Sequence, residues 1–176
     1  MTARNLGMEE ALLIAIEAEL KAQAFYAQAA SWVQDLHGRD LLGRLAAFEQ
    51  HHYQKLTELV RSLQSGGQFI AYEPHTIDQF APLAAGEAAG ALQEGMENEA
   101  GKVPANQAGI LGQAIQMEKM AGERYRVLGD DTTDPAGQTM FRRLAGEELV
   151  HQRILEDEFF SLSNRGVWGW SGMYGE

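Results

Sequence analysis

Two copies of the motif Glu-x-x-His occur in this sequence, each inside a segment with helical periodicity. Glu49 and His52 lie in "FEQHHYQKL", and Glu148 and His151 lie in "LAGEELVHQRIL". Residues three positions apart share one face of a helix, and in both segments that face is otherwise apolar. Charged groups are almost never fully buried unless they are paired or bound to something. The two motifs therefore predict buried polar groups that require a partner.

A further glutamate on an apolar helical stripe precedes each motif by 30 residues, at Glu19 and at Glu118. Aligning the chain with itself at an offset of 99 superimposes the two sets, without an insertion in the helical segments. The same offset superimposes Tyr26 on Tyr125. We therefore expect two similar helical hairpins related by approximate two-fold symmetry.

Four ionised carboxylates that converge in a core repel each other and lose hydration, which costs several kcal/mol apiece unless it is compensated. Two divalent cations would cancel their charge. Oxygen and imidazole ligands suit iron or manganese, with zinc as an alternative. The pattern therefore predicts a dinuclear metal site, and the alternative is a duplicated bundle whose acids are merely solvated. The predicted ligands are Glu19, Glu49, His52, Glu118, Glu148 and His151.

Apolar residues recur every three or four positions in four long segments, which is typical of amphipathic helices. These segments span about residues 7–34, 39–63, 106–128 and 135–162. Asp134 suits an N-cap and Pro135 the first helical position, while the glycines of "QSGGQ" end the second segment. The links within each pair are short, so each pair should form an antiparallel hairpin. The fold class expected is an all-α four-helix bundle.

The two pairs are joined by about 40 residues, 66–105, which are too many for a plain loop and indicate a crossover. This crossover has room for a short helix around residues 86–99, and its glutamates are expected to form a solvated acidic face rather than an iron-access path. We assign residues 1–162 to the bundle and 163–176 to a Gly-rich C-terminal tail. The tail carries Trp168, Trp170 and Tyr174 and either folds back over the bundle or reaches a neighbouring subunit.

Composition excludes several classes of site and partner. The 176 residues suffice for one domain, and they include no cysteine, so the sequence has no disulfide, thiolate zinc site or rubredoxin-type iron site. A net charge of −11 without a Lys/Arg cluster argues against a nucleic-acid partner. The apolar runs are too short for a membrane span, and the first residues lack a secretory hydrophobic region. A cytoplasmic protein is expected.

These residues resemble the ferritin-like di-iron carboxylate proteins, in the rubrerythrin-like branch. That family takes one Glu from each of two helices and Glu-x-x-His from each of the other two. "EAELKAQAFY" and "MEKMAGERY" look like its first and third helices, in which a ligand Glu precedes a Tyr by seven residues. The segments of the two motifs look like its second and fourth helices. The resemblance covers about residues 8–162.

The resemblance implies a ferritin-like bundle in which Glu49 and Glu148 bridge two iron ions. The other ligands divide between the two metals, Glu19 with His52 and Glu118 with His151. Tyr26 and Tyr125 would hydrogen-bond ligand carboxylates, and ordinary core packing is the alternative for each.

The implied activity is a di-iron oxidoreductase that reacts Fe(II) with dioxygen or hydrogen peroxide. Two departures weaken the link to a peroxidase cycle: Ala121 stands where the family often has an extra ligand Glu, and the four-Cys rubredoxin-like domain is absent from this sequence. Electrons would then come from an external donor. An iron-binding or storage protein and a metal-free interaction bundle are the alternatives, and a homo-oligomer, a dimer or larger, is expected.

Four other residues are set aside as ligands. His51 and Glu147 fall out of the repeat, because apolar residues occupy the equivalent positions. We assign His51 a flanking role, with a contact to a ligand as the alternative, and the repeat leaves Glu148 rather than Glu147 as the ligand. His37 and His75 are expected in solvated loops.

Overall fold

The computed structural model of the protein describes residues 8–83 and 106–172, which form four long helices and one short 3₁₀ helix. No strand occurs in these two ranges, and the all-α four-helix bundle is confirmed. The elements are α1 (Met8–Trp32), α2 (Leu36–Gln64), η1 (Ile77–Gln79), α4 (Gln107–Asp131) and α5 (Pro135–Arg165).

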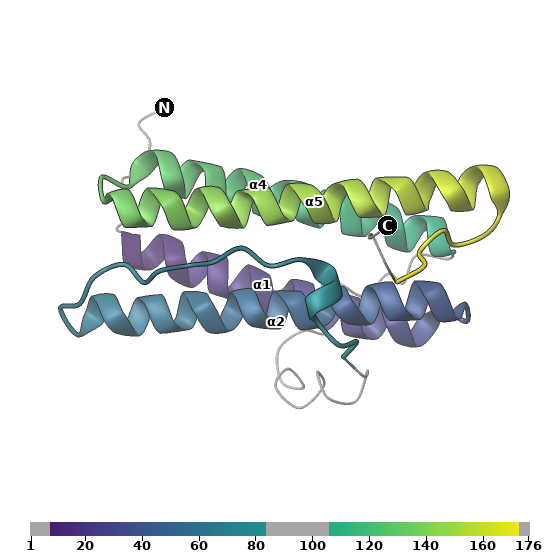
Figure 1. The fold of residues 1–176 in the computed structure, drawn as a ribbon, viewed down its shortest axis with the longest axis horizontal. Coiled ribbons are helices and arrows are strands. Elements are labelled where there is room, and N and C mark those ends of the chain that lie inside the picture. Colours follow the sequence, from purple (N-terminus) through teal and green to yellow (C-terminus); the bar gives the residue numbers. More distant parts are fainter. Residues whose placement is uncertain (1–7, 84–105, 173–176) are drawn as a thin grey trace.

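The helices form two antiparallel hairpins, α1 with α2 and α4 with α5, and α1 also contacts α4 (Figure 1). Helix α2 ends at the end of the bundle opposite to the start of α4, so the connection has to run the length of the bundle. Residues 67–83, which we call the strap, begin this path and pass between α2 and α5 (Figure 1). The short helix expected at 86–99 and the acidic face lie outside the described residues.

In each hairpin, an aspartate caps the N-terminus of the second helix. Asp35 accepts hydrogen bonds from the backbone of His37 and Gly38, and Asp134, 99 residues later, accepts them from Ala136 and Gly137. The N-cap predicted at Asp134 is confirmed. The start predicted for the second helix, about residue 39, was wrong, since α2 begins at Leu36. The helix can start one turn earlier because the Asp35 side chain accepts hydrogen bonds from the first backbone N–H groups, which have no partner within the helix. His37 is therefore exposed on a helix and not in a loop.

The last helix also extends beyond its predicted end. Helix α5 continues to Arg165 and ends at Gly166, whose φ of 71° is favourable for glycine. Phe159 near this end is 39% exposed, although the apolar periodicity of the helix reaches it. Glu158 is buried in its place because it accepts a hydrogen bond of 2.8 Å from the backbone N–H of Gly169, after the chain turns back.

The apolar core consists of two clusters, one toward each end of the bundle. One contains Leu111, Tyr26 and Leu45, and the other contains their repeat partners Leu12, Tyr125 and Leu144. Repeat partners therefore occupy opposite clusters, as expected for a two-fold axis that crosses the middle of the bundle. The predicted ligands lie on each helix between the residues of the two clusters.

This symmetry continues past the helices into the strap and into residues 166–172, which we call the tail. A Cβ added to Gly38 would lie 2.4 Å from the indole of Trp168, and one added to Gly137 would lie 2.7 Å from the ring of Phe69. The two glycines and the two aromatic residues are each 99 positions apart. Each glycine thus makes room for an aromatic ring against the first turn of a helix.

The tail folds back onto its own bundle, which decides between the two options that the sequence left open. Both indoles are buried, with Trp168 Nε1 donating to Gln107 Oε1 at 2.6 Å and Trp170 Nε1 donating to Asp40 Oδ2 at 2.8 Å. Tyr174 lies outside the described residues.

We expect Gly38→Ala to displace Trp168, because the added methyl group overlaps the indole. Overpacking of this kind typically costs about 1–3 kcal/mol. Tryptophan fluorescence should shift to longer wavelength as the indole meets water, and the unfolding temperature should fall. Gly146→Ala is the matched control, since a Cβ there has no neighbour within 4 Å. If Gly38→Ala and Gly146→Ala gave the same fluorescence maximum and the same unfolding temperature, the close packing of Trp168 on Gly38 would be contradicted.

Candidate metal centre

The six predicted ligands converge in the middle of the bundle. Their side chains come from all four long helices and are almost completely shielded from solvent, each at most 3% exposed. Helix α1 contributes Glu19 and helix α4 contributes Glu118. Each of the other two helices contributes a Glu and a His on consecutive turns of one face.

Two groups of four residues have ligand atoms within 4.8 Å of one another. Glu49 and Glu148 belong to both groups. Glu19 and His52 complete the first group, and Glu118 and His151 complete the second. The 99-residue offset relates each residue of one group to a residue of the other, so the site has the two-fold symmetry of the bundle. This division matches the predicted one, while ligation of a metal by these residues stays a prediction.

Both imidazoles present Nδ1 to the carboxylates. His52 Nδ1 lies 3.1 Å from Glu148 Oε1, 3.3 Å from Glu49 Oε2 and 3.9 Å from Glu19 Oε2. His151 Nδ1 lies 3.1 Å from Glu148 Oε2 and 3.5 Å from both Glu49 Oε1 and Glu118 Oε2.

Three of these buried atoms have no hydrogen-bond partner: Glu49 Oε1, Glu148 Oε1 and His52 Nδ1. Buried polar atoms without a partner are rare in native proteins and call for an explanation such as an ion. Carboxylate oxygens and imidazole nitrogens are suitable donors for iron, manganese or zinc. The residues present therefore fit a pair of divalent cations.

The two predicted tyrosines connect the hairpins across the site. Tyr26 on α1 donates its hydroxyl hydrogen to Glu118 Oε1 on α4, and Tyr125 on α4 donates to Glu19 Oε1 on α1. Both phenols are completely buried. Each hydrogen bond occupies one oxygen of the glutamate and leaves Oε2 facing the histidine.

Removing either hydroxyl should destabilise the bundle. In Tyr26→Phe the buried Oε1 of Glu118 loses its donor, and hydrogen bonds to charged groups contribute about 1.5–3 kcal/mol. Thermal unfolding in the presence of a chelator should show a lower midpoint, and Tyr125→Phe should behave alike by symmetry. Tyr53→Phe on α2 is the control, because Tyr53 is only partly buried and lies outside the site. A midpoint equal to that of the control would contradict this role.

Protons compensate the charge of the metal-free site. Burial raises the pKa of Glu118 to about 7, although His151 and Tyr26 act against it. Burial and the neighbouring carboxylates raise the pKa of Glu49 well above its usual range. Burial also favours a higher pKa for Glu148, but His52 and His151 outweigh it and lower that pKa.

The two histidines respond in the opposite sense to burial. Burial alone would lower the pKa of each imidazole, yet the surrounding glutamates raise both well above the usual value. In the metal-free site the glutamates thus favour protonated imidazoles, whose positive charge partly compensates the negative charge of the carboxylates.

The sequence interpretation missed one residue of the site, Glu147. Its carboxylate is 4% exposed, with Oε2 at 2.9 Å from His52 Nε2 and at 2.5 Å from the hydroxyl of Tyr72. Its other oxygen accepts a hydrogen bond from the backbone N–H of His75. The repeat argument rejected Glu147 because Phe48 is its partner. The sequence did offer one signal, the adjacent glutamates 147 and 148 within an apolar helical segment. Only one of two adjacent helical residues can point to the bundle axis, so the other has to meet a neighbouring segment.

The solvated loop predicted for His75 was wrong. The strap holds this side chain half-buried, with its ring centroid 4.3 Å from that of His51 on α2. Burial lowers the pKa of His51 to about 4. Neither residue joins the two ligand groups, so His51 flanks the site as predicted.

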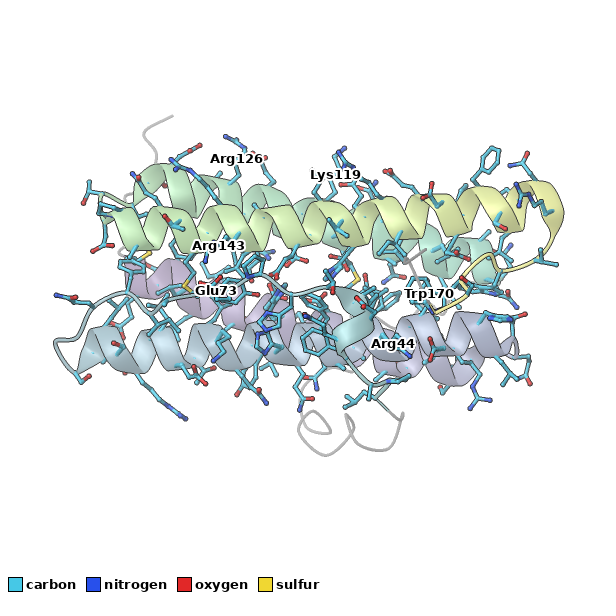
Figure 2. All side chains as sticks on the ribbon, in the orientation of Figure 1. Arg44, Glu73, Lys119, Arg126, Arg143 and Trp170 are labelled. Carbon is cyan, nitrogen blue, oxygen red and sulfur yellow. The ribbon has the colours of Figure 1, made fainter. Side chains whose placement is uncertain are left out.

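Two arginines fix the strap across the site. Arg143 on α5 donates to the carbonyl of Tyr72 and lies 3.1 Å from Glu73 (Figure 2). Arg44 on α2 donates to the carbonyl of Phe80 at 2.8 Å. The strap is thus attached to both hairpins.

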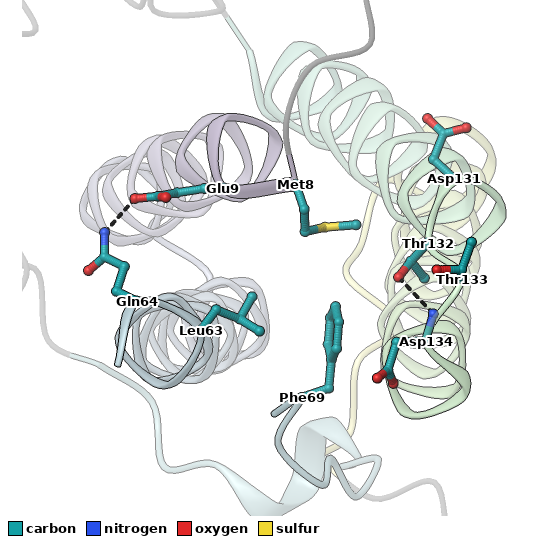
Figure 3. A pocket seen from close by; sticks show the side chains of 9 residues that line it. All are labelled: Met8, Glu9, Leu63, Gln64, Phe69, Asp131, Thr132, Thr133 and Asp134. Atoms are coloured by element: carbon teal, nitrogen blue, oxygen red, sulfur yellow. Dashed lines mark hydrogen bonds between the residues drawn. The ribbon is translucent and has the colours of Figure 1, made fainter. Parts of the chain in front are cut away.

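A cavity of about 460 Å³ opens at the end of the bundle where α1 begins and α2 ends (Figure 3). Met8, Leu63 and Phe69 form its apolar side. The turn 131–134 contributes acids and threonines. Its lining includes none of the six predicted ligands, so the cavity is separate from the metal centre.

No helix over residues 8–83 and 106–172 is long and apolar enough to cross a membrane. No curated protein and no solved structure matched the chain. The family model described as Rubrerythrin matches residues 109–165, which include α4 from its first turn and all of α5. The matched segment contains Glu118, Tyr125, Glu148 and His151. Residues 109–165 are thus similar to the rubrerythrin family, which is a ferritin-like di-iron family.

Proposed function

We propose that this protein is a di-iron oxidoreductase that reacts Fe(II) with dioxygen or hydrogen peroxide. The observation that carries the proposal is the pair of buried ligand groups sharing Glu49 and Glu148, in which three ligand atoms have no hydrogen-bond partner. The family match supports iron as the metal. Manganese or zinc would fit the same donors.

The site would hold two iron ions, whose oxidation from Fe(II) to Fe(III) would supply the two electrons that, with two protons, reduce hydrogen peroxide to two water molecules. The four carboxylates neutralise the metals and hold them next to each other. Tyr26 and Tyr125 orient the terminal glutamates through their hydrogen bonds. The apolar cluster on each side keeps bulk water away from the centre.

Electrons that return the iron to Fe(II) come from a donor outside these 176 residues, because four-Cys iron is absent from the sequence. The cytoplasmic location and the homo-oligomeric state stay predictions. Cell fractionation checks the first, and sedimentation of the purified protein checks the second.

The test begins with metal analysis of protein expressed with iron, where we expect about two iron ions per chain. The reduced protein is then mixed with oxygen and, separately, with peroxide, and the ferric absorption is followed. Rapid oxidation by peroxide, reversible on re-reduction, supports a peroxidase, and rapid oxidation by oxygen supports a ferroxidase. Zinc-loaded protein serves as the redox-inert control.

Two other outcomes would contradict the proposal. Iron loading far above two ions per chain, with ferric mineral in a large assembly, would indicate storage. Protein without tightly bound metal, even after expression with iron, would indicate a metal-free interaction bundle.

A further inference from the structure

The two-fold repeat is broken at position 147, which lies next to the metal centre. Position 147 carries a glutamate, whereas its partner at position 48 carries a phenylalanine. Both side chains are buried, and both lie against the imidazole of a predicted ligand. The two halves of an otherwise symmetric site therefore have different surroundings.

On one side, His52 is held by a carboxylate. Its Nε2 lies 2.9 Å from Glu147 Oε2, while its Nδ1 faces the site. Nδ1 can bind a metal ion only when it is deprotonated, and the remaining ring proton then lies on Nε2, which can donate it to Glu147. The hydroxyl of Tyr72 and the backbone N–H of His75 donate to Glu147 and fix its position.

On the other side, His151 meets an aromatic ring. The centroid of Phe48 lies 4.3 Å from that of His151, with the ring planes at 83°. Phe48 in turn packs against Phe80 of the strap, at a centroid distance of 4.5 Å. This contact restricts the imidazole sterically, but a phenyl ring offers no carboxylate to an imidazole N–H.

We propose that the two metal positions are unequal and fill in order, and that Glu147 is the positioning residue that makes the His52 position the tighter one. This inference rests on the proposed function, since it requires that both ligand groups bind metal. A carboxylate on the outer nitrogen of a ligating histidine fixes its tautomer and increases its basicity, and loss of such a partner typically weakens metal binding 10–100-fold.

The strap takes part in this difference. Tyr72 and His75 belong to it, and both donate to the carboxylate that holds His52. A metal ion bound by His52 therefore favours the observed contacts of the strap with Glu147, and these contacts favour the metal ion, as thermodynamic linkage requires. Among the described residues, the strap reaches His151 only through the packing of Phe80 on Phe48 and not through a hydrogen-bonded carboxylate.

The test is a titration of the metal-free full-length chain with Co²⁺, followed by visible absorption and by calorimetry. The wild-type protein should bind two ions in two steps whose affinities differ by at least about tenfold. Removing one ligand assigns the steps, because His151→Ala should keep the tight step and His52→Ala should lose it. Glu147→Gln should weaken the tight step about 10–100-fold and leave the weak step unchanged.

Two variants separate this role from a general structural effect. Glu158→Gln neutralises another buried acid of α5, which contacts the tail and not the metal centre, and it should leave both steps as in the wild type. Tyr72→Phe keeps the carboxylate but removes one of its donors, and it should weaken the tight step alone by a smaller factor. Circular dichroism checks that each variant is folded.

A single class of two equal sites in the wild type, or equal weakening of both steps by Glu147→Gln, would overturn the inference while leaving the dinuclear centre intact. A wild-type protein that binds no Co²⁺, Fe²⁺ or Mn²⁺ would instead overturn the proposed function itself. The two failures are therefore distinguishable in one set of titrations.

Discussion

Glu148→Gln is expected to abolish binding of both metal ions. Glu148 belongs to both ligand groups, and its two oxygens lie 3.1 Å from Nδ1 of His52 and of His151. Glutamine keeps the volume but removes the charge and one of the two acceptor oxygens. Loss of a shared ligand should exceed the 10–100-fold effect of losing an outer hydrogen-bond partner. Metal content after dialysis should fall from about two ions per chain to almost none.

Two further variants make this prediction specific. Glu19→Gln removes a residue of one group only, so it should leave about one ion per chain. Glu156→Gln changes an exposed glutamate of the same helix as Glu148 and should leave the metal content unchanged. A folded Glu148 variant with a full complement of metal would exclude the shared-ligand arrangement.

The metal-free protein should lose stability as the pH rises from about 5 to about 8. Burial raises the pKa of Glu118 to about 7 from 4.5, so its contribution is complete below 4.5 and is lost as the pH rises through 7. One pKa unit corresponds to about 1.4 kcal/mol, which makes this loss about 3 kcal/mol.

The histidines change stability in the same direction as Glu118. The pKa values of His52 and His151 are raised, so their contribution is present below 6.5 and is lost as the pH rises through the folded-state values. Glu148, whose pKa is lowered, contributes above 4.5 and loses this contribution only at lower pH. Across the neutral range, Glu118, His52 and His151 therefore determine that the stability of the metal-free protein falls as the pH rises.

Bound metal should reverse this dependence. Metal ligands have to be deprotonated, so metal binds more tightly as the pH rises and stabilises the folded state more. Urea unfolding at about pH 6 and about pH 8, with and without a chelator, measures both slopes. Glu118→Gln should flatten the slope of the metal-free protein. Parallel slopes with and without metal would contradict the assignment of these groups as ligands.

Much of the bundle follows from local physics that a sequence displays. A helix repeats every 3.6 residues, so the spacing of Glu49 and His52 on an apolar face determines that both point inward. Asp134 followed by Pro135 marks a helix start because the cap chemistry is local. The 99-residue repeat then related the two hairpins and placed Glu19 and Glu118 at equivalent depths. These features were predictable without knowledge of any long-range contact.

The surroundings of the ligands were decided only by the tertiary structure. Tyr72 and Glu147 are 75 residues apart and meet because the strap returns along α2 and α5, a path that the composition of the crossover did not reveal. The repeat even misled at this position, since it dismissed Glu147 through its apolar partner Phe48. Burial of Glu158 in place of Phe159 likewise depended on where the tail turned back. Helical periodicity predicts the direction in which a side chain leaves its own helix. The contacts of that side chain, however, depend on every segment packed against it.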